Sequence, residues 1–186
     1  MSETPLRRSD ARRTEQRILA LASGVLRTDP TASMSRIADT AGVHRATLYR
    51  HFPTRDDLIE RLAAEATCDG RSIVAQIPDG SATLEEIRRL TRAITEFGER
   101  YGFLIGTSSV MRAGDDPIGL TSLMCRWQEA SLLRGDLPPA WLAAGFTALA
   151  VMLHDATGGR PRIDKAEALY TMFVSGSGVG SDAGSQ

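Results

Sequence analysis

The sequence predicts an all-α protein with a small N-terminal helical unit and a larger helical body. Three observations support this fold class. Apolar residues recur at the i, i+3, i+4, i+7 spacing of amphipathic helices along most of the chain. Breaks rich in proline, glycine and aspartate separate these segments. The length of 186 residues suffices to bury a sizeable core, and 42% hydrophobic with 24% charged residues is ordinary for a globular protein.

The first predicted helix follows a short N-terminal arm. Residues 1–9 lack hydrophobic periodicity and are expected to be flexible, whereas residues 10–26 carry apolar side chains on one face. Thr28-Asp29-Pro30 ends this helix. Four arginines lie around the start of this helix: Arg7, Arg8, Arg12 and Arg13. They suit contacts to phosphates or to an adjacent minor groove. The interpretation that they are solvated charges is equally good.

Two short helices joined by a tight turn come next. Ser33 is placed to cap the first of them, over residues 34–41. Gly42 supplies the left-handed conformation that the turn needs. Val43 and Leu48 are spaced to pack against the first helix, which leaves a surface rich in donors and cations facing outward on the second. Such a surface suits the major groove of DNA, so we interpret the pair as a helix-turn-helix. The alternative is an ordinary surface helix in an α-helical hairpin.

This stretch resembles a known family. Residues 37–52 are IADTAGVHRATLYRHF and residues 55–58 are RDDL, a pattern similar to the DNA-binding domain of the TetR/AcrR transcriptional regulators over about residues 10–60. The resemblance implies a helical ligand-sensing and dimerisation domain after the DNA-binding domain. It also implies a fourth helix that joins the two and transmits movement between them, and repression of transcription.

The expected DNA contacts include both base reading and backbone binding. Arg45 carries the fork that pairs with guanine O6 and N7, and Ala46 is small enough to sit beside a thymine methyl group or to allow close approach. By the resemblance, Thr47, Tyr49 and His51 hold the phosphate backbone. Contacts of that kind set the register on DNA rather than the sequence preference.

Five further residues complete the expected interface. Arg50 suits either a base or a phosphate. His44 stands where the family commonly has a small hydroxyl residue, which is expected to alter the helix cap and the base preference. Ser35 and Arg36 lie near the N-terminus of the preceding helix, where free N–H groups attract phosphate. By the resemblance, Arg55 replaces a lysine that contacts phosphate at the start of the fourth helix.

The rest of the chain is expected to form the body. We expect the N-terminal arm and DNA-binding domain in residues 1–54, the effector-binding and dimerisation domain in residues 55–174, and a disordered Gly/Ser tail in residues 175–186. Capping boxes are predicted at residues 54–57 and 83–86, and an irregular helix over 103–111. A loop follows over 112–117, and Pro117 is suited to the first turn of the next helix, which ends near 134–135. The last two predicted helices cover 138–154 and 164–174.

Two functions are expected of this body. The helix over residues 138–154 is apolar almost all round and is expected to be buried on several sides, pairing with the last helix and their symmetry mates in a homodimer. Large apolar side chains are candidates to line a pocket for a small-molecule effector, although periodicity does not distinguish a pocket from a core; they are Phe97, Phe103, Met111, Met124, Trp127 and Phe146.

Charge and cysteine usage agree with a DNA-binding protein of the cytoplasm. Residues 1–55 carry ten arginines and five acids, a net charge of +5, and the remaining 12 basic and 18 acidic residues give −6. A basic segment on an acidic body indicates a polyanion-binding head. Cys68 and Cys125 lie far apart, as expected of reduced thiols. The longest apolar run is too short to span a bilayer, so no membrane partner is expected.

Other function classes have weaker support. Cys125, His154 and Asp155 are the residue types of a thiol triad but have no motif around them, and the histidines and cysteines lack metal-ligand spacing. No enzymatic activity, metal or cofactor is expected. Together with the family resemblance, which implies repression and ligand sensing, these observations predict a homodimeric repressor that leaves a palindromic double-stranded DNA operator when an apolar or aromatic effector binds. The alternative is an architectural or cell-cycle DNA-binding protein on the same fold, without a ligand.

Overall fold

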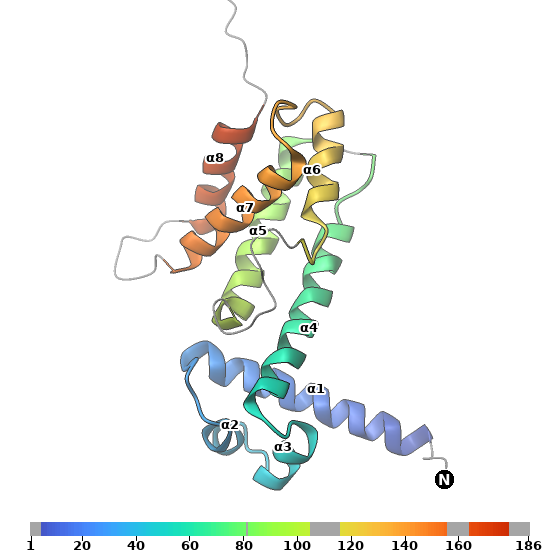
Figure 1. Cartoon of the computed structure of the whole chain (residues 1–186), viewed down its shortest axis with the longest axis vertical. Coiled ribbons are helices and arrows are strands. Elements are labelled where there is room, and N and C mark those ends of the chain that lie inside the picture. Colours follow the sequence, from blue (N-terminus) through green and yellow to red (C-terminus); the bar gives the residue numbers. More distant parts are fainter. Residues whose placement is uncertain (1–4, 81, 105–115, 156–163, 179–186) are drawn as a thin grey trace, which may run out of the picture. The chain divides into compact units, whose positions relative to one another are not determined.

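The computed structural model describes residues 5–80, 82–104, 116–155 and 164–178, and this part of the chain is helical without a β-strand (Figure 1). The predicted all-α fold class is confirmed. The elements are α1 (Pro5–Thr28), α2 (Met34–Thr40), α3 (Arg45–His51), α4 (Arg55–Ala75), α5 (Leu84–Tyr101), the 3-10 helix η1 (Gly102–Leu104), α6 (Leu120–Glu129), α7 (Pro139–Asp155) and α8 (Lys165–Ser177).

The chain divides into two compact units. Among the described residues, the N-terminal unit holds 5–66 with Phe103 and Leu104, and the second unit holds 67–102 and everything from 116 onward. Leu58, Ile59 and Leu62 of α4 belong to the hydrophobic core of the N-terminal unit. The first half of α4 therefore packs with that unit, beyond the boundary expected after residue 54.

Helices α1, α2, α3 and the first half of α4 surround the core of the N-terminal unit. Its fully buried side chains include Ile18, Leu19, Ala22, Leu26, Ile37, Ala38 and Leu48. Helix α1 begins at Pro5, so the expected flexible arm is wrong for residues 5–9. A proline suits this first turn because its missing N–H has no partner in a helix start anyway.

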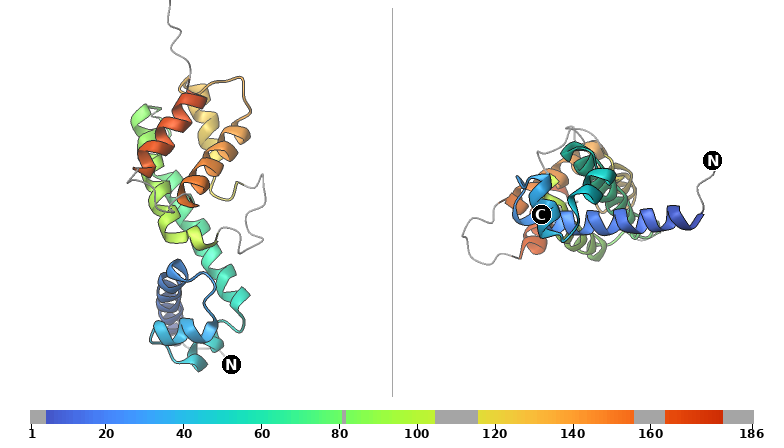
Figure 2. Two further views of the ribbon diagram at one scale, coloured as in Figure 1. Left: turned by 90° about the vertical axis from the view of Figure 1, so that its left-hand side faces the viewer. Right: turned by 90° about the horizontal axis from the view of Figure 1, so that it is seen from below.

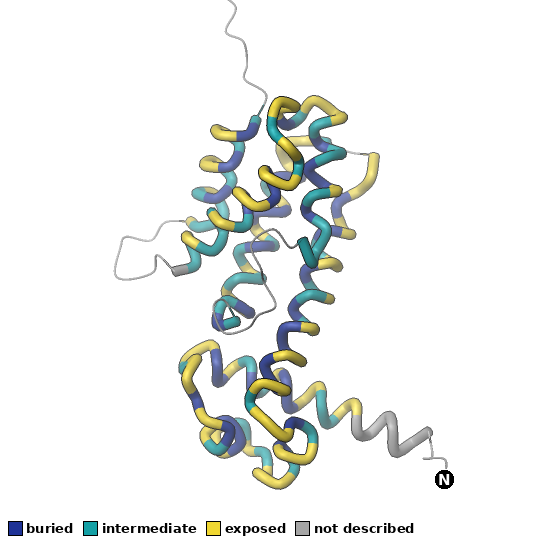
Figure 3. Tube along the Cα trace, viewed as in Figure 1, coloured by how far each residue is buried: buried dark blue, intermediate teal, exposed yellow. Residues whose placement is uncertain are grey.

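In the second unit α8 lies against α5 and α7, and α7 lies against α6 (Figure 2). Buried and exposed positions alternate along these helices, as the spacing of the apolar residues predicts (Figure 3). Phe146 of α7 and Phe173 of α8 meet edge to face, with ring centroids 5.0 Å apart. The expected capping box at Thr83 is confirmed, because its hydroxyl accepts from the Glu86 N–H while the Glu86 carboxylate accepts from the Thr83 N–H.

Helix α6 is shorter than predicted at both ends. Pro117 lies before the helix, because Gly119 has a φ of +88° and breaks the helical path. The Asp116 carboxylate instead accepts from the N–H groups of Gly119, Leu120 and Thr121 at 3.0, 2.8 and 2.6 Å, which satisfies the free donors of the helix start. At the other end, Ser131 has a φ of +57°, so the helix ends at Glu129 rather than near residues 134–135.

Helix α8 extends into the predicted tail. Residues 175–177 are helical, and the Arg134 N–H donates to the Ser177 carbonyl at 2.9 Å. This tertiary contact lies beside a β-bridge between Leu133 and Gly178. The expected disorder is therefore wrong for residues 175–177. The expected helical residues 105–111, the loop residues 112–115 and the tail from residue 179 lie outside the described residues.

Candidate nucleic-acid interface

A glycine turn orients α2 and α3. The Ser33 hydroxyl accepts from the Arg36 N–H at 3.3 Å and caps α2 as expected. Gly42 has a φ of +62°, the left-handed conformation predicted for the turn. The Val43 N–H then donates to the Ala38 carbonyl at 2.9 Å and closes the turn against α2. Leu48, 1% exposed, secures α3 in the core. The predicted helix-turn-helix geometry is present.

His44 caps helix α3. Its Nδ1 accepts from the Ala46 N–H at 3.3 Å, the bond that a hydroxyl residue would accept at this position. Because Nδ1 is the acceptor, the neutral ring carries its proton on Nε2. The exposed imidazole thus replaces a short cap with a longer group that offers an additional donor beside the first turn of α3.

The outward face of α3 is polar and cationic. Arg45, Ala46, Tyr49 and Arg50 are exposed, and Thr47 and His51 are half-buried. Tyr49 exposes 44% of its surface although its neighbour Leu48 is fully buried. Four of the six expected contact residues of α3 are therefore exposed to solvent.

Arg45 is held by a carboxylate of the preceding helix. Its Nη2 lies 2.7 Å from Asp39 Oδ2, and its Nε lies 3.3 Å from Asp39 Oδ1. This hydrogen-bonded pairing holds the pKa of the Asp39 carboxyl below its usual value and raises the pKa of Arg45. Both groups stay ionised at neutral pH. Sequence spacing did not suggest this pair, because it depends on the turn between α2 and α3.

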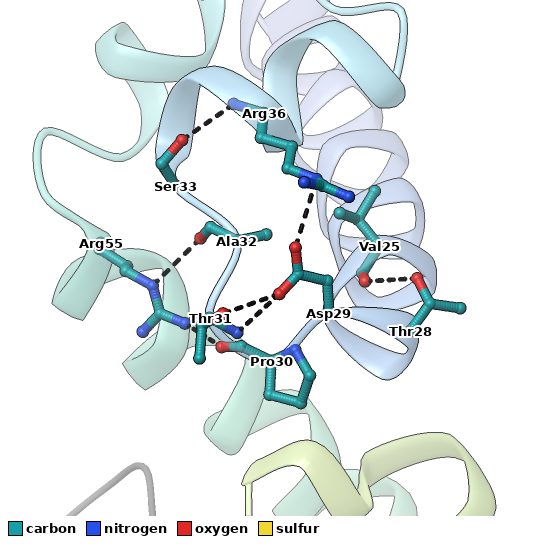
Figure 4. A network of polar contacts seen from close by, with 9 residues as sticks. All are labelled: Val25, Thr28, Asp29, Pro30, Thr31, Ala32, Ser33, Arg36 and Arg55. Carbon is teal, nitrogen blue, oxygen red and sulfur yellow. Dashed lines mark hydrogen bonds and ion pairs between the residues drawn. The ribbon is translucent and has the colours of Figure 1, made fainter.

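Two other arginines of the expected interface bind the loop between α1 and α2 (Figure 4). Arg36 pairs with Asp29 at 3.2 Å. Arg55 donates from Nη2 to the Pro30 carbonyl at 2.5 Å and from Nε to the Ala32 carbonyl at 3.4 Å. Arg55 thus stabilises this loop from the start of α4, and the phosphate contact expected for it stays a prediction.

Three of the six candidate pocket residues share one core. Phe103 belongs to the core of the N-terminal unit, and Met111 lies outside the described residues. Met124, Trp127 and Phe146 are fully buried in the core of the second unit. The sixth, Phe97, is half-buried on α5, with its ring centroid 5.1 Å from that of Tyr101.

Two features of the second unit were not predicted. The buried indole Nε1 of Trp127 has no hydrogen-bond partner in the part of the chain that the structure describes. A groove of about 370 Å³ also opens between α4 and the start of α6. It is lined by Arg71, Val74, Ala75, Ile77, Asp79, Ile118, Gly119, Ser122 and Arg126, none of them a predicted pocket residue. Helical spacing reveals no groove, because the groove depends on how the two segments approach.

Among the described residues, no three histidine, cysteine or acidic side chains are grouped to hold a metal ion. No helix in the same part of the chain is both long and apolar enough to cross a membrane.

Comparison with known proteins identifies the family. Residues 18–62, which contain the helix-turn-helix, match the family of bacterial regulatory proteins, tetR family. The chain is 30% identical over 170 residues to the HTH-type transcriptional repressor LfrR of Mycolicibacterium smegmatis, covering 88% of this chain and 90% of LfrR. The chain belongs to the TetR family of transcriptional regulators.

Solved structures agree with this membership. The crystal structure of LfrR from Mycobacterium smegmatis in complex with proflavine has a TM-score of 0.68 and 26% identity, over 88% of this chain and 96% of LfrR. AibR in complex with isovaleryl coenzyme A and operator DNA shares the fold, with a TM-score of 0.66 and 13% identity over 87% of this chain and 96% of AibR. The DNA-binding helix-turn-helix and the helical body of this TetR regulator therefore follow the family's architecture.

Proposed function

We propose that this TetR regulator is a homodimeric repressor that binds a palindromic operator through α3 and leaves it when an apolar or aromatic molecule binds the second unit. The observation that carries the proposal is that α3 is anchored in the core on one side and accessible on the other. Leu48 anchors the helix while Arg45, Tyr49 and Arg50 remain accessible. A helix held from behind with donors in front meets the requirements of major-groove binding.

The roles on α3 follow from the chemistry of each side chain. Arg45 offers two parallel donors to guanine, so Arg45→Ala is expected to reduce discrimination at one base pair of each half-site by about 5- to 150-fold. The Tyr49 hydroxyl offers one donor suited to a phosphate oxygen. Tyr49→Phe is therefore expected to weaken binding to good and poor sites alike.

In vitro selection tests both roles. The full-length chain selects duplexes from a random-sequence pool, and binding is then measured to duplexes changed at one position at a time. We expect an enriched palindrome with half-sites about one helical turn or more apart. Failure to enrich any sequence would refute specific DNA binding. Retention of full base preference by Arg45→Ala would refute the role of Arg45.

Dimerisation is proposed from an exposed apolar stripe on α7. Trp141 and Met152 are 69% and 66% exposed, and the small exposed residues Ala144, Gly145 and Ala148 lie between them at helical spacing. This stripe faces outward in a single chain, so the expected burial of α7 on several sides stays a prediction that depends on the dimer. Met172 of the adjacent α8 is also exposed. A second copy that covers α7 and α8 would bury the stripe around a two-fold axis.

Charge substitution on α7 tests the dimer. Ala148→Glu places a carboxylate on the stripe, and the two-fold axis places a second one in the same interface, so sedimentation is expected to show a monomer. Ala64→Glu is the matched control, since Ala64 is also an exposed alanine within a helix but lies on α4 in the N-terminal unit. A monomeric wild type at micromolar concentration would contradict the proposed dimer.

The proposed effector site lies among the apolar side chains around Trp127 in the second unit. Binding of a molecule with an acceptor atom would satisfy the Trp127 Nε1–H, which lacks a partner in the described structure. The similarity to LfrR, whose structure was solved with proflavine, supports a planar aromatic ligand. An effector site around Trp127 would be lined by Met124, Trp127 and Phe146. Phe103 would not line it, because Phe103 packs in the other unit.

Proflavine and other planar aromatic compounds serve as probes. Coupling between effector and DNA is typically 1–3 kcal/mol, so operator affinity is expected to fall by about 5- to 150-fold. Quenching of tryptophan fluorescence in the wild type, reduced in Trp127→Phe, would place the ligand near that ring. Unchanged fluorescence and operator affinity across the panel would favour a DNA-binding protein that needs no ligand.

A further inference from the structure

We propose that Asp39 is a specificity-determining residue, whose carboxylate positions the Arg45 guanidinium so that one remaining edge reads guanine. The inference rests on the proposed DNA binding by α3 and deepens it, because it assigns base discrimination to a residue on the other helix of the helix-turn-helix.

The geometry of the pair leaves a reading edge free. A guanidinium has five N–H donors in one plane. Asp39 takes the edge formed by Nε and Nη2, with distances of 3.3 and 2.7 Å to its two carboxylate oxygens. The adjoining end-on edge, with one N–H from each Nη, keeps two parallel donors. Two parallel donors of this kind fit guanine O6 and N7 together.

The pair sits where positioning matters and where folding does not require it. Asp39 is in the last turn of α2, and Arg45 is the first residue of α3. Their side chains are 60% and 57% exposed, and exposed ion pairs contribute little to stability because solvent screens them. Both ends of the pair are fixed to helices whose relative orientation is set by the Gly42 turn. The pair therefore favours one direction of the guanidinium plane before DNA arrives, which supports the specificity of a bidentate contact.

A second ion pair in the same unit shows what a structural carboxylate looks like. Asp29 binds Arg36, but it also accepts from the N–H and the hydroxyl of Thr31, at 3.2 and 2.8 Å, and so organises its loop. Within the described residues, the side-chain oxygens of Asp39 accept hydrogen bonds from Arg45 alone. The contact of Asp39 is therefore directed at the base-reading side chain.

An acid beside a DNA-facing helix has an electrostatic consequence. The Asp39 carboxylate repels phosphates, so it lowers affinity for every DNA sequence. It also prevents Arg45 from swinging to a phosphate oxygen, a contact that carries no sequence information. Removal of the carboxylate is thus expected to change two quantities in opposite directions. Affinity for random DNA increases, and discrimination at the base pair read by Arg45 decreases.

The test uses full-length protein and the duplex that the wild type selects from a random pool. Asp39→Asn keeps the shape but presents an amide that cannot accept from both Arg45 donors. We expect its discrimination at the Arg45-dependent base pair to fall from the wild-type ratio, about 5- to 150-fold, toward onefold. Its affinity for a random-sequence duplex should rise, with a salt slope steeper by about one as Arg45 gains a phosphate contact.

Three controls separate positioning from other effects. Glu60→Gln removes one exposed negative charge from α4 of the same unit, and is expected to leave the base preference unchanged. In an Arg45→Ala background, Asp39→Asn should have no further effect on base preference, because Asp39 acts through Arg45. Asp39→Ser serves as a second variant if the asparagine variant melts at a lower temperature than the wild type.

The outcomes are distinguishable. If the wild type enriches a sequence and both Asp39 variants keep the full preference at every position, the role of Asp39 is refuted while the proposed function stands. If both variants lose affinity for specific and random duplexes equally, Asp39 is structural and the inference is likewise refuted. If the wild type enriches no sequence, the proposed function fails and this inference fails with it.

Discussion

Replacing Leu48 with alanine is expected to loosen α3 from the N-terminal unit. Helix α3 has seven residues, and isolated helices shorter than about 12–15 residues are marginal in water. Its stability therefore depends on packing, and Leu48, 1% exposed, is the buried side chain of this helix. Leucine-to-alanine changes in well-packed cores cost about 2–5 kcal/mol. That loss is a large fraction of the 5–15 kcal/mol that typically stabilises a domain.

The neighbouring residue provides a matched control. Tyr49→Phe removes a hydroxyl from a side chain that is 44% exposed, so its effect on the free energy of unfolding should stay within about 0.5 kcal/mol. Urea unfolding followed by circular dichroism measures stability, and amide hydrogen exchange over residues 45–51 reports on α3 itself. DNA affinity should fall in both variants, but for different reasons. Equal urea midpoints for Leu48→Ala and the wild type, or a loss of stability in Tyr49→Phe matching that of Leu48→Ala, would refute this account.

Three further predictions concern local structure. Gly42→Ala should destabilise the N-terminal unit by about 1 kcal/mol, and Gly42→Asn by less, because an added Cβ meets no atom within 4 Å and only the φ of +62° opposes it; thermal unfolding checks this order. Asp116→Asn should cost about 1 kcal/mol at neutral pH. Burial raises the pKa of Asp116, but hydrogen bonds from Thr121, Leu120 and Gly119 together lower it below its ordinary value. The contribution of this carboxylate is therefore complete above the unfolded pKa of about 4 and is lost as the pH falls through the lower folded value. Urea unfolding at several pH values measures it, and a difference between variant and wild type that persists at the lowest pH would contradict the assignment. Gly102→Ala should cost about 1–3 kcal/mol, because its Cβ would lie 2.0 Å from His154 Nε2, and a smaller loss in a His154→Ala background would confirm the cause.

Local signals explain why the helix-turn-helix could be predicted from the sequence. Ser33 as a cap and Gly42 as a left-handed residue each act within a few residues, so their chemistry is visible in the chain itself. The capping box of Thr83 and Glu86 is of the same kind. Apolar spacing then identified Leu48 as the inward residue of α3. The orientation of the remaining α3 side chains follows from that single assignment.

Tertiary contacts explain the elements that were missed. The start of α6 depends on Asp116, whose carboxylate reaches three N–H groups from outside the helix. The last turn of α8 lies in a Gly/Ser-rich stretch that predicts disorder, yet Arg134, more than 40 residues earlier, bonds its Ser177 carbonyl. Phe103 has the size and polarity of a pocket residue, but its neighbours are those of the N-terminal core. Periodicity carries no information on any of these partners.

Arg36, Arg45 and Arg55 show why charge predicts attraction to DNA better than it predicts contacts. Long-range steering depends on the summed charge of residues 1–55, and ion pairs inside the unit do not change that sum. Contacts depend on which N–H groups face outward. Arg55 is half-buried and bonds loop carbonyls, and Arg36 pairs with a loop carboxylate. Arg45 is also paired, but at the exposed start of α3, where its side chain stays accessible. The proposed base reading by Arg45 depends on a turn geometry that places Asp39 beside it, which a count of positive charges does not reveal.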